Sequence, residues 1–429
     1  MNNYFKKVSF YIIIMLIAAA VIFTTNYYYG QKIAEDVETE IRQTAAANDY
    51  QLRNLKVESN PLLQKIDIKD LNITKRDHSN LIFEQAEINF NWQQIINYIR
   101  YQNFELDKNL DTKIAQINYS NLKNNYQINL KDAELHYKGN LSEETILALK
   151  NESELQLLLE DDHNLDFSAA ELKYNSPYYR SYGLSEQDWN KLSTFNNFRF
   201  QADYDQKNRN LKVEEFNLSS ELLKIIYNFE SIIDYNQQEE QIYFEEAKGD
   251  YDFHLAASDL NFQANSFYQN LEFNQFDFNG SFDLTNQDNK IIANQLDFSL
   301  NLDEFKLVLA EVMAQQLNEY SFGILAENNQ FEISINNFSY QQQYNHPNGS
   351  SHSELDSSLL LAELNSEYNY SDEIPYISSG QLRYKPQTAK AEQLNAFLQL
   401  VLSERITRNE AGFYQLEFWG PIDSLRLNK

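Results

Sequence analysis

The feature that most constrains the fold of this chain is the alternation of apolar and polar residues beyond residue 50. The stretch FDFNGSFDL, residues 276–284, places a large apolar residue at nearly every second position, and QLDFSLNL, residues 295–302, repeats the scheme. Successive side chains of a β-strand point to opposite faces of the sheet. The alternation therefore predicts antiparallel strands with one apolar face and one face in water.

The apolar residues of these two segments form the candidate site of the chain. Either they line a groove for an acyl chain or another apolar ligand, or they form a core that helices cover. The residues alone favour the covered core. The candidate face comprises Phe276, Phe278, Phe282, Leu284, Leu296, Phe298 and Leu300.

Amphipathic helices are predicted directly after several strands. Within residues 303–320 the apolar residues fall three and four apart, and Asp303 suits the N-cap position. The predicted fold class is therefore α+β, with an N-terminal transmembrane helix followed by an antiparallel, β-rich, repetitive body with interspersed amphipathic helices. The predicted helices of the body lie at 91–100, 141–150, 219–229, 303–320 and 389–405.

One polar segment interrupts the alternation. Residues 340–358 are rich in Gln, Asn and Ser, which predicts a long exposed loop. The segment also holds His346 and His352, near Glu354 and Asp356. A metal site needs a fixed geometry that a polar loop rarely supplies, so we predict neither a metal nor another cofactor.

The first thirty residues predict a membrane anchor. Lys6 and Lys7 precede an uncharged run from Val8 to Tyr29, which as a helix spans roughly 33 Å, a membrane thickness. Basic residues before the run and acidic residues after it place the N-terminus in the cytoplasm. We therefore expect one span in a bacterial inner membrane, with the body on the periplasmic or extracellular side.

Four parts are predicted along the chain. Residues 1–30 form the cytoplasmic tip and anchor, and residues 31–48 form a helical stalk. Two β-rich halves follow, at 49–240 and 241–429, and the polar run NQQEEQIYFEEAKGD marks the boundary between them.

Charge and composition exclude several classes of function. The formal net charge is −28, and nucleic-acid binding depends on Lys and Arg that displace counterions from phosphates. The absence of Cys excludes disulfides, thiolate nucleophiles and iron–sulfur clusters. The sparse glycines form no phosphate-binding loop and no nucleophile elbow. We expect no catalytic residues; paired carboxylates for glycoside hydrolysis are the less favoured enzymatic alternative.

Three stretches resemble bacterial envelope families. YYYGQKIAEDVETEI, residues 27–41, and the C-terminal stretch from residue 394 are similar to YdgA-like inner-membrane proteins of unknown function. Residues 55–107 resemble the strand–helix pattern of AsmA/TamB-like proteins. That resemblance implies a β-sheet groove with an apolar interior that moves or organises phospholipids, and it implies no catalytic residues.

Two functions follow from these observations. The first is a non-enzymatic, membrane-anchored envelope protein whose sheet binds or organises lipid or another apolar ligand along a groove. The second is a structural or interaction module with a closed core that binds a partner protein of the envelope, for example through an exposed strand edge.

Overall fold

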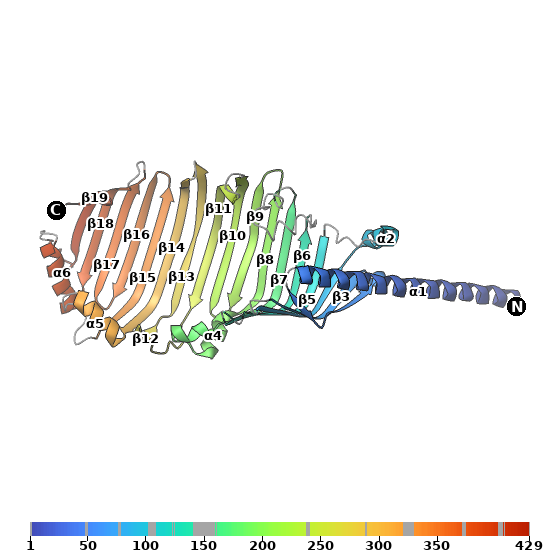
Figure 1. The fold of residues 1–429 in the computed structure, drawn as a ribbon. Coiled ribbons are helices and arrows are strands. Elements are labelled where there is room, and N and C mark those ends of the chain that lie inside the picture. Colours follow the sequence, from blue (N-terminus) through green and yellow to red (C-terminus); the bar gives the residue numbers. More distant parts are fainter. Residues whose placement is uncertain are drawn as a thin grey trace. The chain divides into compact units, whose positions relative to one another are not determined.

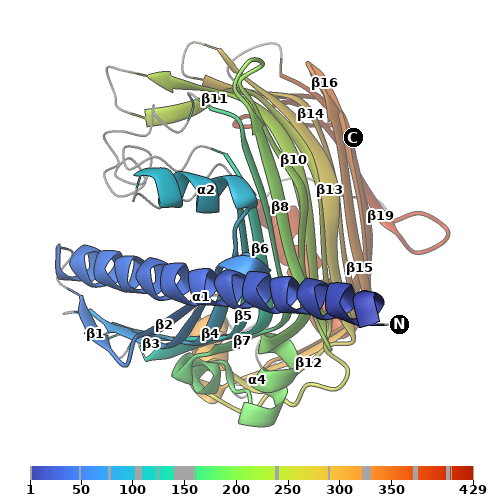
Figure 2. The same cartoon turned by 90° about the vertical axis from the view of Figure 1, so that its right-hand side faces the viewer.

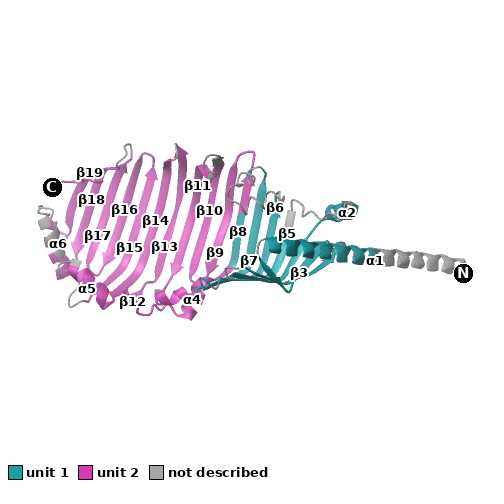
Figure 3. Ribbon diagram, in the orientation of Figure 1, with its two compact units in different colours: residues 1–176, 197–201 teal, residues 177–196, 202–429 magenta. Residues whose placement is uncertain are grey.

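The computed structural model groups the chain into two compact units, which we describe separately. Unit 1 contains residues 1–176 and 197–201, and unit 2 contains residues 177–196 and 202–429 (Figure 3). The structure describes the backbone of residues 2–428 except 48–49, 76–78, 102–108, 122, 124, 140–158, 160, 237–240, 288–289, 321–329, 371–374, 402–405 and 407.

Unit 1 is an antiparallel sheet with two helices. The strands follow one another as neighbours from β3 to β7, and β1 and β2 both pair with β3 (Figure 1). Its elements are α1 (Asn2–Ala47), β1 (Gln51–Arg53), β2 (Lys56–Asn60), β3 (Lys65–Thr74), β4 (Ser79–Asn89), α2 (Trp92–Tyr101), β5 (Asn109–Asn121), β6 (Tyr126–Lys138) and β7 (His163–Asn175).

Helix α1 supplies one side of the core of unit 1. Tyr29, Ile33, Val37 and Ile41 recur every fourth residue, so they form one stripe along the helix. Ile33 is fully buried, and the other three pack against the same cluster. The sheet contributes alternate residues of its strands to this cluster, among them Ile66, Ile68, Ala86, Ile114, Ala133 and Ala169.

Helix α2 begins where the chain changes from strand to helix, and its first turn explains the change. Asn91 accepts a hydrogen bond at its Oδ1 from the backbone N–H of Gln94 (3.0 Å). The Gln94 side chain in turn accepts from the backbone N–H of Asn91 (2.7 Å). This reciprocal capping box satisfies two N–H groups that a helix start leaves unpaired. The predicted helix at 91–100 is confirmed.

Unit 2 is a longer antiparallel sheet. Its strands are neighbours in the order β9, β10, β11, β13, β14, β15, β16, β17, β18, β19 and β20, and β12 also pairs with β14 (Figures 1 and 2). The strand β8 (Thr194–Asp205) has residues in both units. The other elements are α4 (Glu186–Ser193), β9 (Asn210–Ser220), β10 (Leu223–Asn236), β11 (Gln241–Ala256), β12 (Tyr268–Glu272), β13 (Gln275–Gln287), β14 (Lys290–Leu309), α5 (Glu311–Tyr320), β15 (Glu332–Asn345), β16 (Asn348–Ser357), β17 (Leu360–Asn369), β18 (Tyr376–Pro386), α6 (Ala389–Val401), β19 (Tyr414–Pro421) and β20 (Arg426–Asn428).

The fold class α+β is wrong, because most of the described chain is antiparallel β-sheet. The predicted helix at 219–229 is largely strand β10, which pairs with β9 and β11 along its length. The predicted helix at 303–320 is shorter than expected: β14 continues to Leu309, and α5 begins only at Glu311. The predicted helix at 389–405 is present as α6 up to Val401, whereas 402–405 and the predicted helix at 141–150 lie outside the described residues.

The polar segment at 340–358 is a β-hairpin rather than a loop. Its residues complete β15 and form β16, which pair from Asn345 and Asn348 at the turn to Ile335 and Ser357. Neighbouring strands on both sides, β14 and β17, satisfy the outer backbone groups of this hairpin. Polar side chains are compatible with a strand when its backbone is paired on both edges.

The prediction of an N-terminal transmembrane helix is also wrong. Within the part of the chain that the structure describes, no helix combines the length and the apolarity that crossing a membrane requires. From Tyr29 onward α1 instead directs its apolar stripe onto the sheet of unit 1. The side chains of residues 1–22, which include most of the predicted span, are outside the described part.

The division into units differs from the predicted halves. The predicted boundary at 240/241 falls between β10 and β11, which pair with each other inside unit 2 from Leu223 and Leu255 to Asn236 and Gln241. The predicted stalk at 31–48 corresponds to the last part of α1, a helix that packs on the sheet.

Candidate ligand-binding face

The predicted site residues lie on one face of β13 and β14 in unit 2. Phe278 is paired with Leu300, Phe282 with Leu296, and Gly280 with Phe298. Phe276 is paired with Leu302, and Leu284 follows after a register shift beyond Asp283. The register therefore brings all seven predicted residues to the same face of two neighbouring strands.

The pairing of the other strands extends this face across unit 2. Residues that pair directly across neighbouring strands form a row across the sheet, and we name each row after one of its residues. The Phe276 row runs through Leu223, Leu255, Phe276, Leu302, Phe338, Leu355, Ala362, Tyr384 and Tyr414. The Phe278 row runs through Leu218, Ile225, Phe253, Phe278, Leu300, Tyr340, Ser353, Leu364, Leu382 and Leu416.

Two further rows complete what we call the apolar face. The Phe298 row runs through Phe216, Tyr227, Tyr251, Gly280, Phe298, Gln342, Ser351, Ser366, Gly380 and Phe418. The Phe282 row runs through Val213, Phe229, Gly249, Phe282, Leu296, Tyr344, Gly349, Tyr368, Ile377 and Gly420. None of the four rows contains a charged residue.

The described helices of unit 2 do not cover the middle of the apolar face. All seven predicted residues are half-buried, and none belongs to a hydrophobic core cluster. Apart from marginal contacts, described helix–strand packing in unit 2 is limited to α4 against β9 and α6 against β18. Figure 1 shows α4, α5 and α6 at the margins of the sheet. The described helices of unit 2 therefore leave the face open from β10 to β14.

Helix α6 covers only the end of the face. Tyr384 of the Phe276 row is buried and donates a hydrogen bond to Asn395 Oδ1 of α6 (2.5 Å). Tyr414, the next residue in the row, donates to Glu392 Oε2 of the same helix (3.1 Å). These bonds satisfy both phenols, as buried tyrosines require.

Aromatic rings follow one another across the open part of the face. The ring centroids of Tyr251 and Phe278 are 4.9 Å apart, and those of Phe278 and Phe298 are 6.0 Å apart. Phe298 continues to Tyr340 at 5.4 Å. These separations are typical of favourable ring pairs, so the aromatic residues support one another without a second layer.

Glycines on this face lie beneath rings of the next strand. A Cβ on Gly349 would lie 2.3 Å from Cε2 of Tyr368, and one on Gly380 would lie 2.2 Å from Cε2 of Phe418. Gly280 is similarly close to Tyr251 Oη (2.7 Å). A ring that lies over a strand glycine recovers packing that the missing side chain does not supply.

A group of uncharged polar residues interrupts the apolar face on β15, β16 and β17. Ser351 and Ser366 are directly paired, and their hydroxyls are 2.8 Å apart. Tyr340 donates a hydrogen bond to Gln342 Oε1 (2.9 Å). Tyr368 Oη is buried and makes no hydrogen bond of normal geometry to the described residues. Burial raises the pKa of this phenol to about 12, although the nearby Gln342 side chain acts to lower it. We call Tyr340, Gln342, Ser351, Ser366 and Tyr368 the hydroxyl patch.

The sequence reasoning missed the hydroxyl patch. It assigned the whole segment from 340 to 358 to a loop, because few of its residues are apolar. The signal was nevertheless present: Tyr340, Gln342 and Tyr344 continue the alternation that Phe338 begins. Tyr at every second position of a polar run is compatible with a strand.

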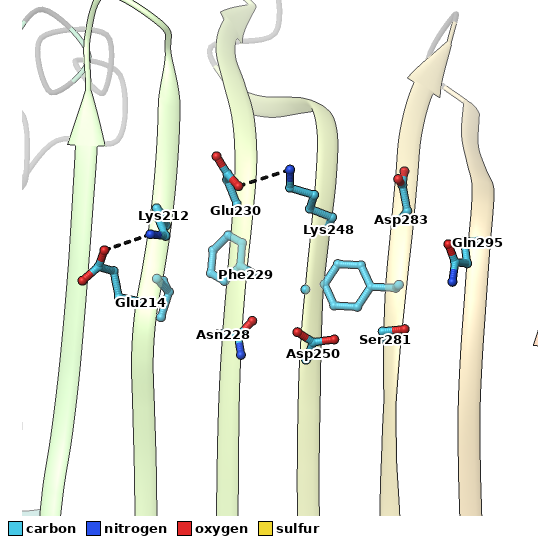
Figure 4. A pocket seen from close by; sticks show the side chains of 13 residues that line it. Lys212, Glu214, Asn228, Phe229, Glu230, Lys248, Asp250, Ser281, Asp283 and Gln295 are labelled. Carbon is cyan, nitrogen blue, oxygen red and sulfur yellow. Dashed lines mark hydrogen bonds and ion pairs between the residues drawn. The ribbon is translucent and has the colours of Figure 1, made fainter.

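The opposite face of unit 2 is charged. A hollow of about 450 Å³ lies across β9, β10, β11, β13 and β14 (Figure 4). Its lining combines charged residues of this face with Val213, Phe229, Gly249 and Phe282 of the Phe282 row. Lys212 pairs with Glu214 Oε1 (2.9 Å) and Lys248 with Glu230 Oε2 (3.3 Å). Hydrogen bonds from Asn210 and Lys248 lower the pKa of Glu230. Since a general acid needs a raised pKa, this hollow gives no support to the glycan-active alternative.

The two histidines of the polar segment do not approach each other as metal ligands. His352 Nδ1 lies 2.6 Å from Asn365 Oδ1, and His346 Nδ1 lies 2.9 Å from the Tyr344 hydroxyl. Among the residues that the structure describes, no group of three or more acidic or His side chains is arranged to hold a metal ion.

Comparison of the chain with models of known protein families, with curated proteins and with solved structures returns no match. The resemblance to YdgA-like and AsmA/TamB-like proteins therefore stays a prediction. The same holds for the bacterial envelope as its location and for an envelope protein as its partner.

Proposed function

We propose that unit 2 binds the hydrocarbon chain of a lipid on its apolar face, without catalysis. The observation that supports this function is the open, charge-free middle of the face, where Tyr251, Phe278 and Phe298 form a continuous aromatic surface. Monomeric proteins rarely expose large continuous apolar patches unless they bind something there. Each methylene removed from water contributes about 0.8 kcal/mol, so a long chain gains more than a small apolar molecule.

The extent of the face suits a lipid chain. Neighbouring strands lie roughly 4.8 Å apart, so the section from β10 to β14 extends roughly 14 Å across β11 and β13. This length is close to half of a bilayer's hydrocarbon core, which is about 30 Å thick. One chain can therefore lie along the rows with every methylene against a ring or an aliphatic side chain.

A pair of neighbouring substitutions tests this function. Phe278 lies on the apolar face and Asn279, the next residue of β13, lies on the opposite face. We expect the purified full chain to bind a pyrene-bearing alkyl probe that has no headgroup. Phe278→Lys should weaken this binding by at least about 10-fold, because it places an ammonium group against the chain. Asn279→Lys should change it by less than about 2-fold.

Two measurements keep the comparison interpretable. Circular dichroism and thermal unfolding of both variants show whether the sheet remains folded. If Phe278→Lys does not fold, Phe278→Ser and Asn279→Ser replace the pair, since they remove the ring without adding charge. A wild-type chain that shows no saturable binding of the alkyl probe, or equal binding by both variants of a folded pair, would contradict the proposed function.

A further inference from the structure

The hydroxyl patch lies beside the open aromatic section, on the same face. Gln342, Ser351 and Ser366 continue the Phe298 row directly after Phe298 itself. Tyr368 belongs to the neighbouring Phe282 row, two residues along β17 from Ser366. A hydrocarbon chain that lies over β10 to β14 therefore ends beside the hydroxyl patch. The polar end of such a lipid meets hydroxyl and amide groups there.

The patch retains hydrogen-bonding capacity for a ligand. Ser351 and Ser366 have two hydroxyl hydrogens and use one of them between themselves. A ligand group that accepts the second hydrogen therefore completes the hydrogen bonding of this pair.

The charge of the face selects among headgroups. No Lys or Arg occurs in the four rows, so a phosphate or carboxylate at the patch would lose water without gaining a cation. The chain carries a formal net charge of −28, which further disfavours anionic ligands. The rows hold no carboxylate either, so a cationic headgroup would also lack a counter-ion there.

We propose that the ligand of unit 2 is a neutral long-chain amphiphile with a hydroxyl-bearing headgroup, of the monoacylglycerol class, and that the hydroxyl patch receives this headgroup. This inference rests on the proposed function, since it assigns the polar end of the same ligand. Gln342, Ser351 and Ser366 act as the specificity-determining residues, whereas the aromatic section binds the hydrocarbon chain without regard to the headgroup.

Displacement of the pyrene-bearing alkyl probe tests the headgroup preference. The competitors are monoacylglycerol, lysophosphatidic acid and lysophosphatidylcholine of one chain length, together with a plain alkane of that length. We expect monoacylglycerol to displace the probe at a concentration at least about 10-fold lower than either phosphate-bearing lipid does. Displacement by the alkane measures the contribution of the hydrocarbon chain without a headgroup.

Substitutions in the patch assign the effect to its residues. Ser351→Ala combined with Ser366→Ala should weaken monoacylglycerol binding by about 5-fold, the value of one hydrogen bond, and leave alkane binding unchanged. The matched control is Ser350→Ala combined with Ser379→Ala, because both serines are exposed on the opposite face of β16 and β18. This control should alter neither ligand's binding.

The outcomes separate this inference from the proposed function. If lysophosphatidic acid or lysophosphatidylcholine competes as well as monoacylglycerol, the headgroup assignment is wrong. The proposed binding of the hydrocarbon chain is then unaffected. Equal loss of alkane and monoacylglycerol binding in the patch variants would show that these residues shape the face and receive no headgroup. If the alkyl probe itself does not bind, the proposed function fails.

Discussion

The ring of Tyr368 on β17 lies directly over Gly349 on β16. A Cβ on Gly349 would lie within 2.6 Å of three ring and hydroxyl atoms of Tyr368. Tyr368 also stacks on Tyr344 of β15, with centroids 6.2 Å apart and planes inclined by 10°. The glycine therefore lets the ring lie flat on the sheet, where it closes one side of the hydroxyl patch.

Gly349→Ala should destabilise unit 2 by about 1–3 kcal/mol, because the added methyl forces the Tyr368 ring from its position. Ser350→Ala, at the next residue and on the opposite face, should have little effect. Urea unfolding followed by circular dichroism measures both values. Combining Gly349→Ala with Tyr368→Ala should cost less than the sum of the two single changes, and strict additivity would contradict the contact.

Tyr368→Phe should leave the stability of the free protein unchanged or raise it by about 1 kcal/mol, since the substitution removes a buried hydroxyl that has no described partner. Tyr384→Phe is the informative contrast, because the Tyr384 hydroxyl donates to Asn395 Oδ1 and its loss should lower stability by about 1 kcal/mol. Thermal unfolding of the two variants should shift in different directions. A clear loss of stability in Tyr368→Phe would indicate that the hydroxyl is already paired.

In unit 1, Tyr98→Phe should lower stability by about 1 kcal/mol. The fully buried Tyr98 of α2 donates a hydrogen bond to Asp36 Oδ2 of α1 (2.6 Å), and burial together with this bond raises the pKa of the phenol. Tyr28→Phe, at an exposed tyrosine of α1, is the control. Hydrogen exchange of α2 should accelerate in Tyr98→Phe alone; unchanged exchange would show that the bond does not hold α2.

The stability of unit 1 should fall in acid partly through Glu58. Hydrogen bonds and attraction from Lys56 and Lys69 lower the pKa of Glu58 to about 2. A carboxyl whose pKa is lower in the folded state stabilises that state above its unfolded pKa, near 4.5, and the contribution disappears as the pH falls toward about 2. The effect is below about 1 kcal/mol, because the ion pairs are exposed and screened.

Glu58→Gln tests this pH dependence. The stability difference between wild type and Glu58→Gln should be largest near neutral pH and should vanish toward pH of about 2. Added salt should reduce it. Glu40→Gln, at an exposed residue of α1, is the control for removal of one carboxylate. A difference that stays constant with pH would exclude the ion pairs as its cause.

The alternation in the sequence predicts the strands on which the candidate face depends. Phe276, Phe278 and Phe282 recur in a strict period of two, and no helical pattern competes with it, so β13 follows from local information. Local information does not predict which elements pack against these residues. Whether a ring row is covered depends on helices whose position the residues of the strand do not encode, and the described helices lie at the margins.

Other elements could not be predicted because long-range pairing decided between two local readings. Around the start of β10, helical spacing is satisfied by Leu222, Ile225, Ile226 and Phe229, while a period of two is satisfied by Leu223, Ile225, Tyr227 and Phe229. Pairing with β9 and β11 selects the strand, and this pairing involves residues far apart in the chain. The hairpin of β15 and β16 is a similar case, because its polar residues indicate a loop until β14 and β17 supply partners.

The central claim is that a hydrocarbon chain lies on the apolar face of unit 2. Photolabelling of the purified chain with a diazirine-bearing long-chain alkyl probe, followed by mass spectrometry of the labelled peptides, tests it most directly. The account predicts saturable labels on Tyr251, Phe278 and Phe298, which lie on the apolar face of β11, β13 and β14. Labels on the intervening residues Asp252, Asn279 and Ser299, or labelling that does not saturate, would contradict it.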